Sequence, residues 1–126
     1  MAQPEKLFWQ QVRKNLTEFS WITKEGIYFT TELKVTKSNK VNLSPHQIAY
    51  HEERKNSCAF ILVKRLLESN PRKSTVHIYG AEQVRDLAVK GLIVPSLSSS
   101  DPINWSFVQE QLATLVRGRT NDQLIG

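Results

Sequence analysis

Cysteine, glycine and long apolar runs are scarce in this chain, and each scarcity excludes a class of protein. The single cysteine, Cys58, rules out an internal disulfide and a cysteine-based zinc site. The 126 residues include only five glycines and no glycine-rich loop, which argues against a nucleotide-binding fold. No apolar run reaches the roughly 18 residues that a membrane span needs. The first residues contain no apolar signal region, so we expect an intracellular protein with no membrane partner.

The amino-acid composition is typical of one globular domain. With 126 residues, of which 40% are apolar and 23% charged, the chain can bury one core. We place a single domain at residues 1–118 and interpret residues 119–126 as a loose C-terminal tail.

The positive charge is concentrated in the middle of the chain. Residues 34–73 contain nine of the seventeen basic residues against three glutamates, a net charge of +6, whereas the rest carries eight basic and nine acidic residues, a net charge of −1. A concentrated basic excess favours a polyanionic partner. A solvated lysine-rich surface is the alternative explanation.

Hydrophobic periodicity predicts helices and strands of a small α/β domain. We expect helices over residues 4–16, 44–55, 81–90 and 101–118, and strands over residues 19–23, 27–35, 58–64 and 74–79. Ser44 and Gln47 form a capping box around Pro45, and Gly91 and Gly118 end the last two helices. We interpret residues 92–95 as a short extended piece and residues 96–100 as a serine linker. This order predicts a small mixed sheet flanked by helices, with strands 27–35 and 58–64 parallel.

The most informative motif is Glu32-Leu33-Lys34, at the end of an apolar strand. Because side chains alternate along a strand, Glu32 and Lys34 point to the same face. A carboxylate can hold Mg²⁺ there, and a neighbouring ammonium can stabilise charge that develops on a phosphodiester. The Glu-x-Lys motif is weak alone, but a basic loop, a helix with an early glutamine and another apolar strand follow it.

In this context residues 27–64 resemble the core of the PD-(D/E)xK superfamily, the restriction-endonuclease-like nucleases. The resemblance is closest to the VRR-NUC and Holliday junction resolvase-like nucleases of phages. The segments EKLFWQQVRKNL and INWSFVQEQLATL resemble the first and last helices of that family. The similarity spans most of residues 5–117 and is specific only between residues 32 and 63. It implies a restriction-endonuclease-like fold.

The resemblance also implies roles for individual residues. Glu32 matches the acidic metal ligand, Lys34 the catalytic lysine, and the Leu33 carbonyl the main-chain metal ligand. Gln47 matches the glutamine of the following helix, which faces the catalytic site. Glu5 corresponds, less closely, to a carboxylate on the first helix.

One expected residue is missing. The family places a Pro-Asp segment about a dozen residues before the Glu-x-Lys strand, but this chain carries Phe19 there. Glu18 lies near the start of a strand that would pair with strand 27–35, so it is the candidate substitute ligand. Glu25 lies in the intervening turn, too far along the hairpin from Glu32. Loss of one of two carboxylates weakens Mg²⁺ binding severely.

Two functions therefore remain open. The first is a DNA endonuclease dependent on Mg²⁺ or Mn²⁺, with branched or duplex DNA as its substrate. The second is a catalytically degenerate relative that binds nucleic acid, inhibits a host machine or belongs to a phage particle. In either case we expect phosphate contacts from four basic side chains, those of Lys37, Lys40, Arg54 and Lys55. The resemblance implies a homodimer, other phage proteins as further partners, and the host cytoplasm or the virion as its location.

Histidines and tryptophans provide weaker candidates. The i, i+5 spacing of His46 and His51 does not favour a zinc pair, and we interpret both as surface or loop-facing polar residues. His77 alternates outward on its strand and is expected to be exposed. Trp9, Trp21 and Trp105 are possible stacking platforms for unpaired bases, although Trp105 lies on the apolar face of its helix and is better explained as core.

Overall fold

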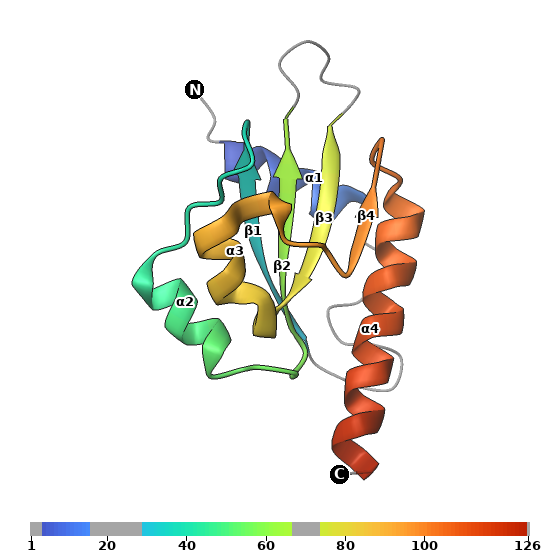
Figure 1. Ribbon diagram of the computed structural model, residues 1–126. Helices are drawn as coiled ribbons and strands as arrows, with labels where there is room; N and C mark the ends of the chain where they lie inside the picture. The colour runs from blue at the N-terminus through green and yellow to red at the C-terminus, as the bar shows by residue number, and fades with distance from the viewer. Residues whose placement is uncertain (1–3, 16–28, 67–73, 126) are drawn as a thin grey trace.

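The computed structural model describes residues 4–15, 29–66 and 74–125, and the side chains of residues 6–11, 29–66 and 74–119. Four α-helices, four strands and two short 3-10 helices follow one another along these residues (Figure 1). Their order is α1 (Pro4–Asn15), β1 (Thr30–Thr36), α2 (Pro45–Glu52), β2 (Ala59–Arg65), β3 (Thr75–Gly80), η2 (Ala81–Gln83), α3 (Val84–Lys90), η3 (Gly91–Ile93), β4 (Ser98–Ser100) and α4 (Trp105–Ile125).

The strands form one mixed sheet in the order β1-β2-β3-β4. β1 and β2 are parallel, whereas β3 is antiparallel to both of its neighbours. The predicted mixed α/β architecture and the parallel pairing of the two central predicted strands are therefore confirmed. The strand expected over residues 19–23 lies outside the described residues.

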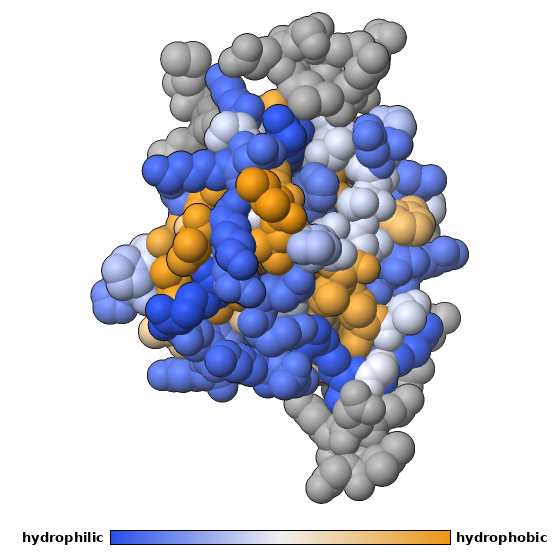
Figure 2. Space-filling view, viewed as in Figure 1, coloured by the Kyte–Doolittle hydropathy of each residue, from blue (hydrophilic) through white to orange (hydrophobic). Residues whose placement is uncertain are grey.

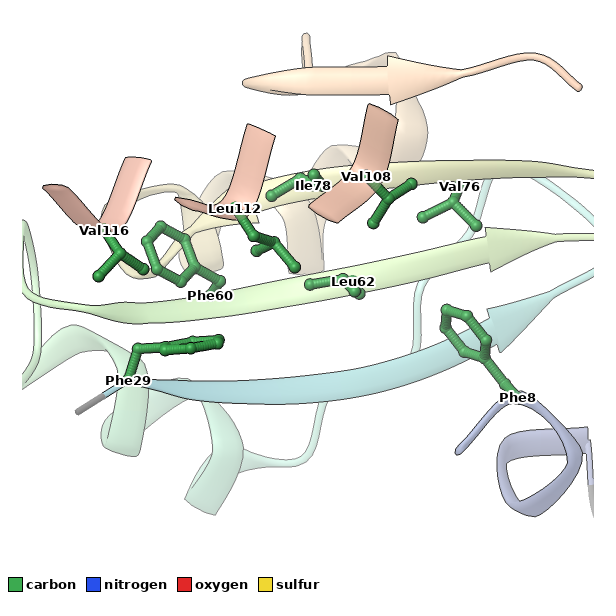
Figure 3. Packing of buried hydrophobic residues seen from close by; sticks show 9 residues of the cluster. All are labelled: Phe8, Phe29, Phe60, Leu62, Val76, Ile78, Val108, Leu112 and Val116. Atoms are coloured by element: carbon green, nitrogen blue, oxygen red, sulfur yellow. The ribbon is translucent and has the colours of Figure 1, made fainter. Parts of the chain in front are cut away.

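Helices cover both faces of the sheet, and each face buries its own core. Alternation along β2 sends Phe60 and Leu62 to one face and Ile61 and Val63 to the other. The first face packs against α1 and α4 through nine buried side chains (Figure 3), those of Phe8, Phe29, Phe60, Leu62, Val76, Ile78, Val108, Leu112 and Val116. Because both faces of β2 are covered, the strand reads as an uninterrupted apolar run.

The second core lies between the sheet and α3, on the face turned toward the viewer in Figure 1. Tyr79 is fully buried there, and its hydroxyl donates a hydrogen bond to the Val94 carbonyl at 2.9 Å. Burial raises the pKa of Tyr79 to about 12, so this hydroxyl keeps its proton. We call this side of the sheet the α3 face. It carries the candidate site.

The predicted helix start at Ser44 is confirmed. The Ser44 hydroxyl accepts a hydrogen bond from the Gln47 amide at 3.1 Å, and the Gln47 side chain accepts one from the Ser44 amide at 3.0 Å. Pro45 occupies the first turn, where its missing N–H has no consequence. The helix ends at Glu52 rather than Lys55, and Asn56 turns the chain with a φ of 62°.

Three expectations for the C-terminal part of the chain are wrong. Residues 98–100 are not a linker, because their backbone pairs with β3 and forms the edge strand β4. Gly118 does not end the last helix, since α4 continues to Ile125. A glycine stops a helix when it adopts a positive φ, and among the described glycines only Gly91 does so. Residues 92–93, expected to be extended, belong to η3.

Among the described residues, no helix is both long and apolar enough to cross a membrane.

Candidate functional site

The register of β1 places Glu32 and Lys34 on the α3 face. Glu32 lies opposite Ile61 and Lys34 opposite Val63, and both of these partners belong to the core on that face. The intervening Leu33 packs against the other core. Within the described part of the chain, no hydrogen bond or ion pair engages either charged side chain. A carboxylate and an ammonium are thus presented side by side and unpaired.

Gln47 connects the surroundings of these two residues. Glu32 and Gln47 both line a cavity of about 290 Å³ between β1 and α2, which we call the β1–α2 hollow. Its other lining residues are Thr30, Thr31, His46, Tyr50 and His51. Lys34 and Gln47 both line a second, more open hollow of about 530 Å³, together with Lys40, Val41, Asn42, Leu43, Ser44 and Ala88. The three predicted catalytic residues therefore border adjoining hollows.

The backbone of β1 leaves the Leu33 carbonyl pointing away from β2. The Thr30 amide donates to the Cys58 carbonyl at 2.9 Å, and the Thr36 carbonyl accepts from the Leu66 amide at 2.8 Å. Peptide groups alternate in direction along a strand, so the even-numbered residues bond to β2 and Leu33 faces the opposite edge. In the described residues no strand pairs with that edge. The Leu33 carbonyl is thus directed toward the edge of β1 that faces away from β2.

Hard oxygen ligands at the site are few. Glu32 and the Leu33 carbonyl are the donors just described, and no group of three histidine, cysteine or acidic side chains in the described residues is arranged to hold a metal ion. The candidate substitute Glu18 lies outside the described residues, as does the side chain of Glu5. One carboxylate with a carbonyl suits Mg²⁺ or Mn²⁺ in kind, and such ions take phosphate oxygens and water as their remaining ligands.

The predicted phosphate-contacting residues fall into two separate groups. Lys37 and Lys40 are exposed on the loop after β1, and the Thr36 hydroxyl holds this loop by donating to the Lys40 carbonyl at 2.7 Å. Arg54 and Lys55 follow the opposite end of α2, about 12 Å away along a helix of eight residues. Arg54 also lies 3.7 Å above the Tyr50 ring and donates to the Tyr50 carbonyl at 2.9 Å. Only the loop lysines adjoin Lys34.

His51 contradicts its prediction as a surface or loop-facing residue. It is 1% exposed, and neither ring nitrogen has a hydrogen-bond partner among the described residues. Its ring lies edge-on to Tyr50, with 5.1 Å between centroids. Burial, and to a smaller extent the charge of Arg54, lowers the pKa of His51, so the ring is neutral near pH 7. Helix periodicity offers a partial signal, since residue 51 follows Ile48 and Gln47 at spacings that face the sheet.

The other weak candidates have mixed outcomes. His46 is exposed, as predicted, although it borders the β1–α2 hollow together with His51. His77 is half-buried rather than exposed. Trp105 packs against the core of α1 and α4, with its ring centroid 6.4 Å from that of Phe8, and Trp9 is 42% exposed. Trp21 lies outside the described residues.

Hydrophilic residues cover most of the α3 face in Figure 2, with apolar patches near its middle. The exposed apolar side chains of this region include Val89, Ile93 and Leu97.

The sequence matches no protein-family model, and no curated protein or solved structure is significantly similar to it.

Proposed function

We propose that the protein is a metal-dependent DNA endonuclease with a restriction-endonuclease-like fold, and that its catalytic centre lies where β1 meets α2. One observation carries this proposal. Glu32 and Lys34 project from the same face of one strand with no ion-pair partner among the described residues, and both adjoin Gln47 at the start of the next helix. This is the spatial arrangement that the resemblance to PD-(D/E)xK nucleases requires of these three residues.

Each residue has a distinct task in the proposed reaction. Lys34 places an ammonium beside the phosphodiester, where it stabilises negative charge on the phosphoryl oxygens. Glu32 and the Leu33 carbonyl would hold the divalent cation. Gln47 stabilises the start of α2, because its side-chain oxygen accepts a hydrogen bond from the Ser44 amide at 3.0 Å. Its amide group remains available as a donor toward the substrate.

When bound, Mg²⁺ or Mn²⁺ activates a water molecule and neutralises phosphate charge. The described residues offer this ion one carboxylate, so we expect its affinity for the free protein to be low. Phosphate oxygens of the substrate would supply further ligands, so binding of DNA and of metal ion should reinforce each other by the same factor.

Cleavage of a labelled four-way DNA junction and of the matching duplex, with Mg²⁺ or Mn²⁺, tests the proposal. We compare the unaltered protein with Glu32→Gln and with Glu110→Gln, a control on the exposed surface of α4. We expect the unaltered protein and Glu110→Gln to cut, and Glu32→Gln to cut at least about 100-fold more slowly. Unchanged cutting by Glu32→Gln would overturn the assignment.

The second candidate function is binding without catalysis. It is favoured by the absence, among the described residues, of a metal-binding group of three side chains. The chain would then use the same basic surface to hold nucleic acid, to inhibit a host machine or to join a phage particle. Junction binding with no cleavage under either metal ion supports this second function and rejects the first.

A branched DNA substrate would also require a particular oligomeric state. Two symmetric nicks in a branched DNA need two catalytic centres, so we propose a homodimer that acts on junctions. Sedimentation of the protein with and without a junction measures the number of protomers in the complex. A single protomer per junction would contradict the homodimer.

A further inference from the structure

The α3 face continues beyond the candidate catalytic centre into a polar region near the end of β2. Alternation and register place Arg65 of β2, and Thr75 and His77 of β3, on the same face as Lys34. In Figure 1, α2 lies toward the other end of these strands, whereas α3 crosses in front of the middle of the sheet. All four side chains are half-exposed. Two neighbouring strands thus present cationic side chains, Lys34 and Arg65, on this face of the sheet.

Among the residues that the structure describes, Arg65 has no counterion. Three other arginines engage protein oxygens: Arg54 bonds to a carbonyl, and Arg85 and Arg119 bond to carboxylates. The Arg65 side chain makes no hydrogen bond or ion pair among the described residues, and its Nε is buried without a partner there. The other N–H groups of this guanidinium can donate to an anion that accepts several hydrogen bonds, such as phosphate.

His77 provides a second donor beside Arg65. Its partner across the sheet is Val63, and it lies two residues from Thr75, the direct partner of Arg65. The His77 Nε2 is 2.9 Å from the Thr75 hydroxyl, which fixes the ring. Burial and then the charge of Arg65 lower the pKa of His77, while Asp101, after β4, acts in the opposite direction. The direct neighbour of His77 on β4, Ser99, carries no charge.

Lys34 connects this region to the catalytic centre. It is the β1 partner of Val63, so it lies on the row of side chains that also contains His77. Strands are about 4.8 Å apart, which separates the backbones of Lys34 and His77 by roughly 10 Å. Glu32 is two residues before Lys34 on the same strand and face. A chain of phosphates that crosses Lys34 would therefore reach Arg65.

We propose that Arg65 and His77, with Lys34 beside them, form a second anion site that binds a phosphate group. That this phosphate belongs to the DNA backbone rests on the proposed function, whereas recognition of the phosphate itself does not. The site would hold the strand beyond the phosphodiester at Glu32 and so define the path of the DNA across the sheet.

The first test uses inorganic phosphate and needs no DNA. The ring signals of His77 are titrated by NMR in phosphate and in chloride at equal ionic strength, with the signals of the exposed His46 as an internal reference. Phosphate bound between Arg65 and His77 stabilises the imidazolium, so we expect the apparent pKa of His77 to rise in phosphate. The rise should disappear in Arg65→Gln. An equal rise in both proteins, or none in the unaltered protein, would overturn the site.

The second test measures the salt dependence of duplex binding. Each phosphate contact contributes about 0.9 to the slope of log K against log salt concentration. We expect Arg65→Gln to reduce the magnitude of this slope by about that amount. Arg65→Lys keeps the charge and should preserve most of the magnitude. Arg117→Gln, an exposed control on α4, should leave the slope unchanged. Equal slopes for all variants would refute a DNA phosphate at Arg65.

The two tests separate this inference from the proposed function. If the protein binds no DNA but phosphate still raises the pKa of His77, the anion site stands and its assignment to DNA fails. If junction cleavage depends on Glu32 while Arg65→Gln changes neither the effect of phosphate on the His77 pKa nor the salt slope of duplex binding, the endonuclease stands and the second site is refuted.

Discussion

Arg119 donates two hydrogen bonds to the carboxylate of Glu82 and so joins the last part of α4 to η2. The Nη1–Oε2 distance is 2.9 Å, and the same Nη1 donates to the Ser57 carbonyl at 3.0 Å. The guanidinium also lies 4.9 Å from the centre of the Phe60 ring. Because the Arg119 side chain is only 13% exposed, this ion pair is shielded from solvent. The side chain of Arg119, the first residue after Gly118, thus attaches this part of α4 to the rest of the domain.

Breaking this attachment should destabilise the whole domain. Arg119→Met keeps much of the side-chain volume but leaves Glu82 without its donors, and we expect the free energy of unfolding to fall by about 2–3 kcal/mol. Urea denaturation measures the change, with Arg117→Met, two residues earlier on the exposed surface, as the control. Equal stability of the two variants would contradict the structural role of the ion pair.

The same ion pair predicts sensitivity to acid. Burial alone would raise the pKa of Glu82, but the hydrogen bonds and charge of Arg119 outweigh it, so the pKa is lowered. A carboxyl with a lowered pKa in the folded state stabilises the protein above its ordinary pKa and loses that contribution as the pH falls through the folded value. Below about pH 4.5, the stability of the unaltered protein should therefore fall faster than that of Arg119→Met.

His51 is expected to reduce stability, because its ring is 1% exposed and neither nitrogen is bonded among the described residues. Replacing a buried, unsatisfied polar group by an apolar one of similar size removes a desolvation cost of about 1–3 kcal/mol. His51→Leu should thus raise the free energy of unfolding at pH 7.5. His46→Leu, at an exposed position of the same helix, is the control and should change it little.

The difference in the free energy of unfolding between His51→Leu and the unaltered protein should depend on pH. The pKa of His51 is lowered in the folded state, so the unfolded chain takes up a proton first, and stability falls as the pH drops below about 6.5. His77 shifts in the same direction. The advantage of His51→Leu over the unaltered protein should therefore grow between pH 7.5 and pH 5.5. A constant difference would show that His51 is not protonated selectively in the unfolded chain.

Gln47 combines a structural role with a proposed catalytic one, and two substitutions separate them. Gln47→Ala removes one half of the capping box, which should cost about 1 kcal/mol of stability. Gln47→Glu retains an acceptor for the Ser44 amide and should restore that stability. If cleavage recovers together with stability in Gln47→Glu, the glutamine acts through the helix cap. If cleavage stays low, its amide group contributes directly.

Local rules predicted the parts of the fold where one interaction dominates. The capping box of Ser44 and Gln47 was readable because a helix start depends on neighbouring residues. The parallel pairing of β1 with β2 followed from a helix between two apolar strands. Glu32 and Lys34 share a face because strand periodicity is strict.

Tertiary context decided the parts that the sequence did not predict. The serines of β4 have low strand preference, yet β3 offers them a free edge with backbone partners. Gly118 resembles a helix stop, but α4 continues across it because Leu112 and Val116 pack against the sheet and Arg119 bonds to Glu82. The burial of His51 depends on how closely α2 approaches the sheet. That distance is not encoded in the spacing of the histidines.

The two groups of basic residues around α2 lead to the last prediction. Lys37 and Lys40 are exposed on a loop that adjoins Lys34, whereas Lys55 is exposed at the opposite end of α2. If DNA passes over Lys34, the loop lysines meet its phosphates and Lys55 does not. Lys37→Ala combined with Lys40→Ala should weaken duplex binding and lower the salt slope by about 1.8, the sum of two contacts. Fluorescence anisotropy at several salt concentrations measures both quantities. Lys55→Ala is the matched control, and a larger loss of slope in this variant would place the DNA at the other end of the helix.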